Sequence, residues 1–463
     1  MITRLVIEER VREWGLVEEV VEKDYVLSWL LWGIGSEPTL GATWIFKGGT
    51  CLKKCFIETY RFSEDLDFTV LPGGPISAEE VRPLLNGVLQ RVHDQTGIDF
   101  GGREPFLKTH TSGLYTEGRV YYRGPRNTPS VASIKLDLSA SERLVRPPVI
   151  RKINHAFPDE LPAPGSIRCY SFEEVFAEKI RAMGERGRPR DLFDIINLFR
   201  RSDLRNQPAL IRDVLGDKCT SKGVPVPTFE SIASSSTRGE LESEWANMLA
   251  HQLPALPPFD DFWNELENLF ACLIGTIQEE RLDAFVGVHE PVQPWTPPAT
   301  AFVWGEGVPL EPVRFAAANQ LCVELTYQHT VRLIEPYSLR RSRAGKLLLC
   351  AVKVETRESR TYRVDRIQAL KVSTQPFTPV FRIEFSPTGQ IYAPYLARPR
   401  LANPFPARAK PSLPRHGPVY IIRCNYCRRE FKRRTMDFTL RPHKRGTQQC
   451  PSMQGSLVRT TYE

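Results

Sequence analysis

The spacing of apolar and polar residues divides the first half of the chain into helices and strands. Apolar residues recur at helical spacing over residues 17–32, and residues 77–96 begin with a serine and two glutamates, as helices commonly do. The apolar run 44–46 and the alternating stretches 65–68 and 133–139 predict strands, and residues 105–125 have the pattern of a hairpin. The pattern therefore predicts an α+β core.

Helical patterns dominate again from residue 171 to about 280. Ser171 is expected to cap a helix that ends at Gly184, and Asp191 is expected to cap the next one, after the arginine-rich connector 186–190. Such a connector could bind nucleotide phosphates or an RNA backbone. Beyond it, a short helix at 312–319 and strands at 322–327, 330–339, 346–354, 359–364 and 369–373 predict a mostly β domain.

Proline-rich stretches mark the boundaries between these regions. We predict an α+β region with a helical second half at 1–285, a linker at 286–299, a β domain at 300–398, a second linker at 399–418 and a basic tail at 419–463. A chain of 463 residues, 41% of them hydrophobic, is long enough for several folded domains.

The charge distribution and the cysteines limit the classes of protein to which the chain can belong. The net charge is +8, and the segment from residue 399 holds 14 Lys and Arg against three Asp and Glu, so the excess lies in the tail and permits a nucleic-acid partner. No run of about 18 apolar residues is present, which predicts no membrane segment. Most cysteines stand alone in apolar segments, which predicts reduced, buried thiols and a cytoplasmic protein.

The candidate chemistry lies in FKGGT, residues 46–50, and RFSEDLDF, residues 61–68. Paired glycines let a backbone approach a phosphate closely. Asp65 and Asp67 are two residues apart on a predicted strand, so both carboxylates point to one face. Adjacent carboxylates repel each other unless a cation lies between them, and Mg²⁺ with triphosphate oxygens meets that need.

Three further acids and one lysine are candidates for the same site. Asp137 lies between two leucines on the strand 133–139. Lys179 lies on the helix that starts near Ser171, and Asp191 and Asp194 follow it by 12 and 15 residues. The sequence does not choose among Asp137, Asp191 and Asp194 for a third acid.

The two motifs together resemble the polymerase-β-like nucleotidyltransferases, and more narrowly the AbiEii/AbiGii-type toxins, over roughly residues 15–280. The strings EKDY at 22–25 and RDLFDI at 190–195 share this resemblance. It implies that Asp65 and Asp67 hold two Mg²⁺, that Lys179 neutralises the triphosphate and that the helix bearing EKDY braces the sheet. It also implies a set of nucleotide-binding residues: Lys47, Gly48, Gly49, Thr50, Arg61 and Ser63.

The strands after residue 320 resemble the WYL domain, an SH3-like β-barrel that senses ligands in bacterial regulators and defence systems. Leu347 and Leu348 replace the first two residues of the signature, and only Leu349 is kept. The resemblance implies a site for a nucleotide or nucleic-acid end at four residues: Arg332, Tyr337, Arg363 and Arg366.

The basic tail contains half of a zinc motif. Cys424 and Cys427 have the Cys-x₂-Cys spacing that brings two thiolates to one tetrahedral edge. His443 and Cys450 would complete four ligands of a zinc ribbon that holds a structural Zn²⁺, although a second Cys-x₂-Cys is missing. The arginines and lysines around these residues would suit a nucleic-acid backbone.

These features predict an Mg²⁺-dependent enzyme that transfers NMP from an NTP to an RNA 3′ end, with tRNA suggested by analogy with the family. The family also implies a separate antitoxin, and the fused β domain suggests a regulatory ligand that gates the enzyme in a toxin or phage-defence effector. The alternatives are a non-catalytic regulator that senses nucleic acid or a ligand, and nucleotidylation of a protein or small molecule.

Overall fold

The computed structural model describes residues 1–57, 61–201, 207–233, 235–276, 282–285, 292–293, 310–342, 345–385, 395–396 and 418–462. The chain forms two compact units, Met1–Pro399 and Arg400–Glu463. Both predicted linkers, 286–299 and 399–418, lie outside the described residues except at 292–293 and 418. None of the helices in the described ranges has the length and apolar character needed to cross a membrane.

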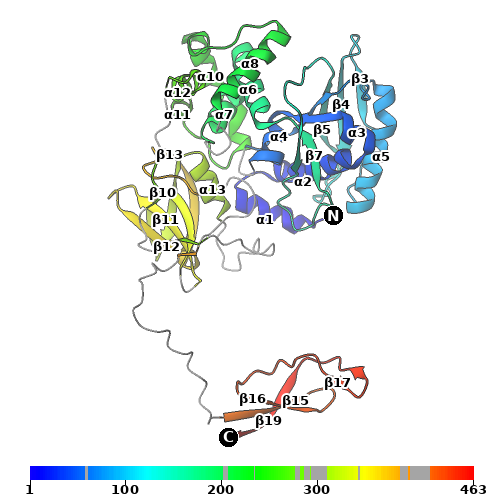
Figure 1. Ribbon diagram of the computed structural model, residues 1–463, viewed down its shortest axis with the longest axis vertical. Helices are drawn as coiled ribbons and strands as arrows, with labels where there is room; N and C mark the ends of the chain where they lie inside the picture. Colours follow the sequence, from blue (N-terminus) through cyan, green and yellow to red (C-terminus); the bar gives the residue numbers. More distant parts are fainter. Residues whose placement is uncertain are drawn as a thin grey trace. The chain divides into compact units, whose positions relative to one another are not determined.

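A seven-stranded mixed sheet organises the start of the first unit; Figure 1 labels four of its strands, β3, β4, β5 and β7. The strand order is β3-β4-β5-β2-β1-β7-β6. Its strands are β1 (Trp44–Lys47), β2 (Asp65–Val70), β3 (Phe106–Thr109), β4 (Tyr115–Tyr122), β5 (Ala132–Ser139), β6 (Val149–Lys152) and β7 (Ser166–Cys169). The pairs β2–β5 and β1–β7 are parallel, and the other neighbours are antiparallel.

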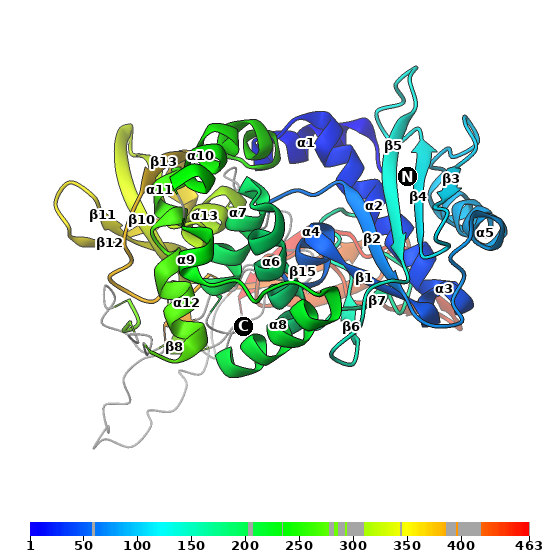
Figure 2. The same ribbon diagram turned by 90° about the horizontal axis from the view of Figure 1, so that it is seen from above.

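Helices accompany this sheet and continue the chain after it. The first group is α1 (Arg4–Trp14), α2 (Glu18–Ser36), α3 (Pro38–Thr43), α4 (Gly48–Cys51) and α5 (Ala78–Thr96). The second group is α6 (Phe172–Arg186), α7 (Pro189–Phe199), α8 (Pro208–Lys222), α9 (Phe229–Ile232), α10 (Ser235–Leu249), α11 (Phe259–Trp263) and α12 (Leu266–Ile274). Figure 2 shows α6 and α8 between the sheet and the rest of the second group.

Two details differ from the predicted helix boundaries. The first helix after Ser171 passes Gly184 and ends at Arg186, where Gly187 has a positive φ of 48°. The next helix begins at Pro189 with Arg188 as its N-cap, so Asp191 lies in the first turn and the prediction that it caps the helix is wrong. Proline suits this first position because its fixed φ matches the helix and it has no N–H to leave unpaired.

The string EKDY on α2 anchors that helix to four separate segments. Its side chains contact Arg126, Glu64, Lys54 and Asp159, respectively. The Asp24–Lys54 ion pair, at 2.7 Å, is buried, and Lys54 also donates a hydrogen bond to Ser28 Oγ at 2.9 Å. Lys54 lies in a π-helical turn, Leu52–Phe56, that directly follows α4. Helix α2 therefore holds the segment that leads away from the Gly-Gly-Thr turn.

The second half of this unit contains an antiparallel sheet of order β12-β11-β10-β9-β13, preceded by α13 (Glu311–Ala318). Its strands are β9 (Leu321–Tyr327), β10 (Thr330–Arg341), β11 (Leu347–Lys353), β12 (Ser359–Arg363) and β13 (Ile367–Pro376). Two short strands, β8 (Val292–Gln293) and β14 (Tyr395–Leu396), extend the sheet from β10. One large hydrophobic core extends from the N-terminal sheet to α13 and strands β9 to β11, and a second, smaller cluster lies around Tyr337.

The second unit is a small β structure. A three-stranded sheet of order β16-β15-β19 contains β15 (Pro418–Cys424), β16 (Glu430–Arg433) and β19 (Gly455–Tyr462). A two-stranded ribbon pairs β17 (Lys444–Arg445) with β18 (Gln448–Gln449). The described structure thus confirms the predicted order of an α+β core, an antiparallel β-sheet and a small C-terminal sheet.

Replacing Lys54 with Met should strongly destabilise the protein, because it leaves Asp24 buried without its cation. We expect a loss of about 3–5 kcal/mol in the free energy of unfolding, measured by urea denaturation. Arg4→Ala is the matched control: Arg4 pairs with Glu8 at the surface and its side chain is 56% exposed, so its loss should cost less than about 1 kcal/mol. Equal, small losses in the two variants would contradict a bracing role for Lys54.

Candidate functional site

Three carboxylates lie side by side on the paired strands β2 and β5. In the parallel register, Asp67 is the partner of Asp137 and Asp65 is the partner of Lys135. Because alternate residues of a strand share a face, Asp65 and Asp67 point to the same side, and Asp137 lies beside them. We call these three residues the acidic cluster.

The electrostatics of the acidic cluster favour a bound cation. The pKa of Asp67 is raised to about 6, chiefly by burial and also by the neighbouring Asp137 and Asp65, against the lowering effect of Lys47. Burial also raises the pKa of Asp65, with Asp137 adding to the effect and Lys135 opposing it. A metal ion bound between two such buried carboxylates would lower their pKa and keep them ionised.

Asp137 is turned toward other partners. Tyr115 donates its hydroxyl to Asp137 at 2.8 Å, and Lys135 Nζ lies 2.5 Å from the other carboxylate oxygen. Within the described residues, three or more possible ligand atoms come within 4.8 Å of one another only in two groups built on cysteines. The acidic cluster is wider than that, and a metal held by all three carboxylates would have to compete with Lys135 for Asp137.

The Gly-Gly-Thr turn is tightly packed against the cluster. A Cβ on Gly48, whose φ is +82°, would lie 2.4 Å from Asp67 Oδ2, and one on Gly49 would lie 2.6 Å from the Arg61 guanidinium and 3.2 Å from Ser63 Oγ. Thr50 donates its hydroxyl to the Asp65 carbonyl at 2.5 Å. Gly48 is therefore required by its positive φ, a Cβ on Gly49 would displace the buried Arg61 guanidinium, and Thr50 fixes the turn to β2.

Lys179 on α6 is held by the two aspartates of α7. Its ammonium lies 2.7 Å from Asp194 and 3.9 Å from Asp191, and it acts electrostatically on Asp67. Asp194 is fully buried and also receives two hydrogen bonds from Arg61, at 2.7 and 2.8 Å. Burial alone would raise the pKa of Asp194, but Arg61 and Lys179 hold it well below its usual range.

These ion pairs distinguish the three candidates for a third acid. Arg186 donates two hydrogen bonds to Asp191, each 2.9 Å long. Asp191 and Asp194 thus neutralise Arg61, Lys179 and Arg186, whereas Asp137 lies beside Asp67. Of the three candidates, only Asp137 is paired with Asp67 in the sheet, and its carboxylate is also bonded to Lys135 and Tyr115.

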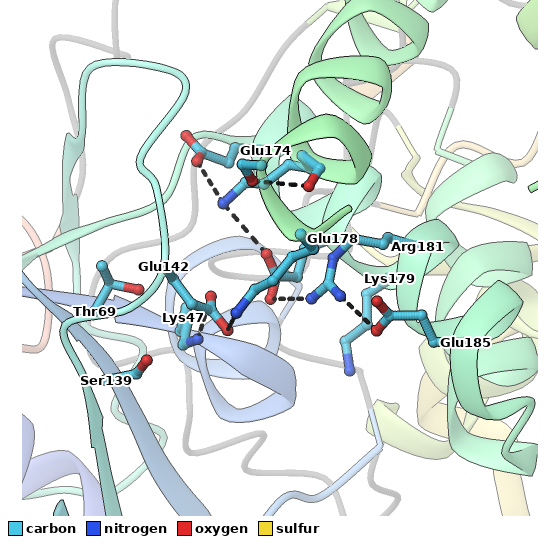
Figure 3. A network of polar contacts seen from close by, with 12 residues as sticks. Lys47, Thr69, Ser139, Glu142, Glu174, Glu178, Lys179, Arg181 and Glu185 are labelled. Carbon is cyan, nitrogen blue, oxygen red and sulfur yellow. Dashed lines mark hydrogen bonds and ion pairs between the residues drawn. The ribbon is translucent and has the colours of Figure 1, made fainter. Parts of the chain in front are cut away.

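Lys47 faces a buried polar network rather than the acidic cluster alone (Figure 3). Its ammonium lies 2.5 Å from Glu142, which follows β5, and Glu178 on α6 is the strongest influence raising its pKa against the lowering effect of burial. Glu178 in turn lies 3.3 Å from Lys218 on α8. Figure 3 shows Lys179 extending away from this network, so α6 presents Lys179 and Glu178 to different neighbours.

Sequence reasoning missed several of these residues. Lys135 is two residues before Asp137 on β5, so strand alternation could have identified it as a cation beside the acids. Tyr115 and Glu142 carry no comparable signal, because their contacts depend on how β4 and the loop after β5 pack. Arg190, from the predicted phosphate-binding connector, acts electrostatically on Asp65.

The residues predicted to bind a ligand in the β9–β13 region differ in accessibility. Tyr337 is fully buried among Phe285, Phe377 and Phe381, and its hydroxyl donates to Glu335 at 3.0 Å. Arg332 donates to the Tyr327 carbonyl at 2.8 Å, and Arg363 pairs with Asp365. Tyr337 is therefore part of the core, and only Arg332, Arg363 and Arg366 remain candidates for a ligand site.

The four predicted zinc ligands of the second unit lie together. Ligand atoms of Cys424, Cys427, His443 and Cys450 all come within 4.8 Å of one another. His443 Nε2 lies 3.2 Å from Cys427 Sγ, and His443 Nδ1 lies 2.9 Å from the Arg441 carbonyl. Because a carbonyl only accepts, Nδ1 carries the hydrogen and the lone pair of Nε2 faces the thiols. This orientation suits Zn²⁺, for which a second hydrogen bond typically orients the histidine.

Comparison with known proteins agrees with this geometry. The sequence model of the family described as "Nucleotidyl transferase AbiEii toxin, Type IV TA system" matches residues 29–265, and that of the WYL domain matches residues 309–372. A search of curated proteins found no match. Among solved structures, "Proteasome accessory factor B/C (PafBC) of Arthrobacter aurescens" is similar over 87% of this chain and 76% of that chain, at 12% identity and a TM-score of 0.16. A TM-score this low carries no argument.

The two matches therefore identify an AbiEii-type nucleotidyltransferase domain followed by a WYL domain. Since the first match covers slightly more than half of the chain, the protein belongs to the AbiEii nucleotidyltransferase family.

The raised pKa of Asp67 makes the stability of the metal-free protein depend on pH. A folded-state pKa of about 6 lies above the ordinary value of 3.8, so the stabilisation that this group provides is complete below about pH 4 and is lost as the pH rises through 6. In EDTA at pH 7.5, Asp67→Asn should therefore raise the melting temperature above that of the wild type, and the difference should vanish near pH 4.

Asp213→Asn is the control for this measurement, because the Asp213 side chain is 69% exposed. It should leave the melting temperature within about one degree of the wild type at both pH values. An Asp67→Asn difference of equal size at pH 4 and pH 7.5 would show that the pKa of Asp67 is not raised.

Proposed function

We propose that the protein transfers a nucleoside monophosphate from an NTP to an RNA 3′ end, with tRNA as the acceptor, and that it acts as a toxin or defence effector restrained by its WYL domain. The observation that carries the proposal is the pairing of Asp67 with Asp137, with Asp65 on the same face and Lys179 nearby. A protein that only binds nucleotide has no need to hold buried carboxylates that raise one another's pKa.

In this mechanism Asp65 and Asp67 would hold Mg²⁺, joined by Asp137 when Lys135 gives way. When bound, Mg²⁺ neutralises charge on the phosphates and activates the attacking hydroxyl. Lys179 offers its ammonium to the triphosphate and is kept in place by Asp194. The backbone of Gly48 and Gly49 approaches the phosphates, and the Ser63 hydroxyl beside Gly49 donates to them.

The composition of the second unit favours a polymeric acceptor. Arg428, Arg429 and Lys432 lie close in sequence to Tyr426, whose side chain is 64% exposed. An exposed aromatic ring among cations suits a nucleic-acid strand, because bases stack on the ring while the cations meet the phosphates. A small-molecule acceptor would gain nothing from this surface.

A direct contact supports regulation by the WYL domain. Arg200 caps the C-terminal end of α7, the helix that carries Asp191 and Asp194. It donates one hydrogen bond to the Asn319 carbonyl at the end of α13, at 3.2 Å, and another to Glu265 before α12, at 2.6 Å. A shift of α13 would therefore reach the helix that positions Lys179.

End-labelling tests the reaction itself. The full-length protein is incubated with Mg²⁺, total tRNA and each α-labelled NTP in turn, beside Asp65→Asn/Asp67→Asn. The double variant should lose label transfer to tRNA by at least about a hundredfold, since the metal contributes several kcal/mol to such reactions. Asp213→Asn, an exposed acid on α8, should keep full activity.

The other outcomes reject parts of the proposal. Label on the protein or on a small molecule would exclude RNA as the acceptor. No label with any nucleotide, while nucleotide still binds, would favour a non-catalytic sensor. Label that persists in the double variant would exclude the acidic cluster as the catalytic site.

Removing the Arg200 contact should relieve the restraint that the WYL domain is proposed to place on nucleotide transfer. We expect Arg200→Ala to raise the rate of label transfer by roughly three- to tenfold, which corresponds to a coupling of about 1 kcal/mol. Arg212→Ala, which removes a half-exposed arginine from α8, should not change the rate. An unchanged or lower rate in Arg200→Ala, with an unchanged melting temperature, would contradict regulation through α7.

A further inference from the structure

Three thiols meet in the core behind the Gly-Gly-Thr turn. Cys51 ends α4, Cys55 lies in the following π-helical turn and Cys169 ends β7. Their sulfur atoms all lie within 4.8 Å of one another, and all three residues are buried. We call them the thiol cluster. The sequence pattern gave no sign of it, because Cys169 stands alone in its segment.

The thiol cluster follows from the way the turn is built. Cys51 and Cys55 are four residues apart, so their side chains lie on one face of the helical segment. Cys169 is the parallel partner of Phe46 on β1, and Tyr170 N donates to the Phe46 carbonyl at 3.0 Å. Since Lys47 and Gly48 follow Phe46, the cluster joins both sides of the turn to β7.

The donor set selects for a particular class of ion. Thiolates are soft ligands that prefer Zn²⁺ and similar thiophilic ions over Mg²⁺. Three sulfurs bound to one such ion at about 2.3 Å lie roughly 4 Å apart. A spread of at most 4.8 Å therefore needs only small side-chain shifts to bind an ion.

The charges at and around the thiol cluster would balance those of a bound divalent ion. Arg151 acts electrostatically on Cys55 and Cys169, and its guanidinium lies 4.8 Å from the Phe56 ring centroid. Three thiolates, one divalent cation and this guanidinium sum to zero charge, which is what a buried site requires. Within the described residues, no His, Asp or Glu joins the group, so the site offers sulfur alone.

We propose that Cys51, Cys55 and Cys169 bind a thiophilic divalent metal ion of the Zn²⁺ class. The ion would tie the helix that follows the Gly-Gly-Thr turn to β7. This site is separate from the acidic cluster and from the four ligands of the second unit, and it does not depend on the proposed transferase reaction.

Cadmium binding by the full-length protein tests the site, because Cd²⁺–thiolate bonds give a charge-transfer absorption band. The reduced protein carries Cys424→Ala and Cys427→Ala, which disables the metal site of the second unit. We expect this protein to bind one Cd²⁺ per chain, with a rise in melting temperature, and Zn²⁺ to compete for the same site. Adding Cys169→Ala should abolish both the band and the rise.

Cys219→Ala is the matched control, since Cys219 is equally buried but belongs to neither cysteine group. It should keep the band at full intensity. Cys51→Ser serves as a second test should Cys169→Ala fail to fold, and it should lose the band while keeping the far-ultraviolet circular dichroism. The absence of a band in the Cys424→Ala/Cys427→Ala protein, or a band that survives both Cys169→Ala and Cys51→Ser, would overturn the proposal.

Discussion

The structure depends on one electrostatic constraint, which is the placement of three carboxylates next to one another on β2 and β5. The parallel register sets Asp67 against Asp137, and strand alternation adds Asp65 to the same face. Burial, together with repulsion from Asp137 and Asp65, raises the pKa of Asp67 to about 6. A fold can keep such a cluster only if cations surround it. Lys47, Lys135 and Lys179 supply part of that charge, and a bound metal ion would supply the rest.

Ion pairs with the surrounding elements hold these lysines in place. Helix α6 carries Lys179, which faces Asp194 of α7, and it also carries Glu178, which acts on Lys47 from another side. Glu178 keeps a pKa of about 2 in spite of its burial, because Lys47 and Lys218 stabilise its charge. The result is a chain of alternating charges that links the sheet to the helical half. Movement of α6 or α7 would therefore alter the cluster, and the Arg200 hydrogen bond to Asn319 links α7 to the WYL region.

Much of this site could be predicted from sequence, because its signals are local. The spacing of Asp65 and Asp67 needs only strand alternation, and the Cys-x₂-Cys turn needs only a tight bend. The sequence could not choose between Asp194 and Asp137 as the third acid, because Arg61, the partner of Asp194, lies 133 residues away in sequence. The burial of Tyr337 and the meeting of Cys51 with Cys169 depend in the same way on packing between distant segments. Propensity also misplaced the start of α7, where Pro189 begins the helix two residues before Asp191.

The most direct test of the central claim is a crystal structure of the full-length protein with Mg²⁺ and an NTP analogue that cannot be cleaved between its α- and β-phosphates. The account predicts metal density at Asp65 and Asp67, a triphosphate along Gly48 and Gly49, and Lys179 in contact with a phosphate oxygen. Asp137 should have left Lys135 for the metal. A triphosphate bound elsewhere, or bound at this place without metal at Asp65 and Asp67, would contradict the account.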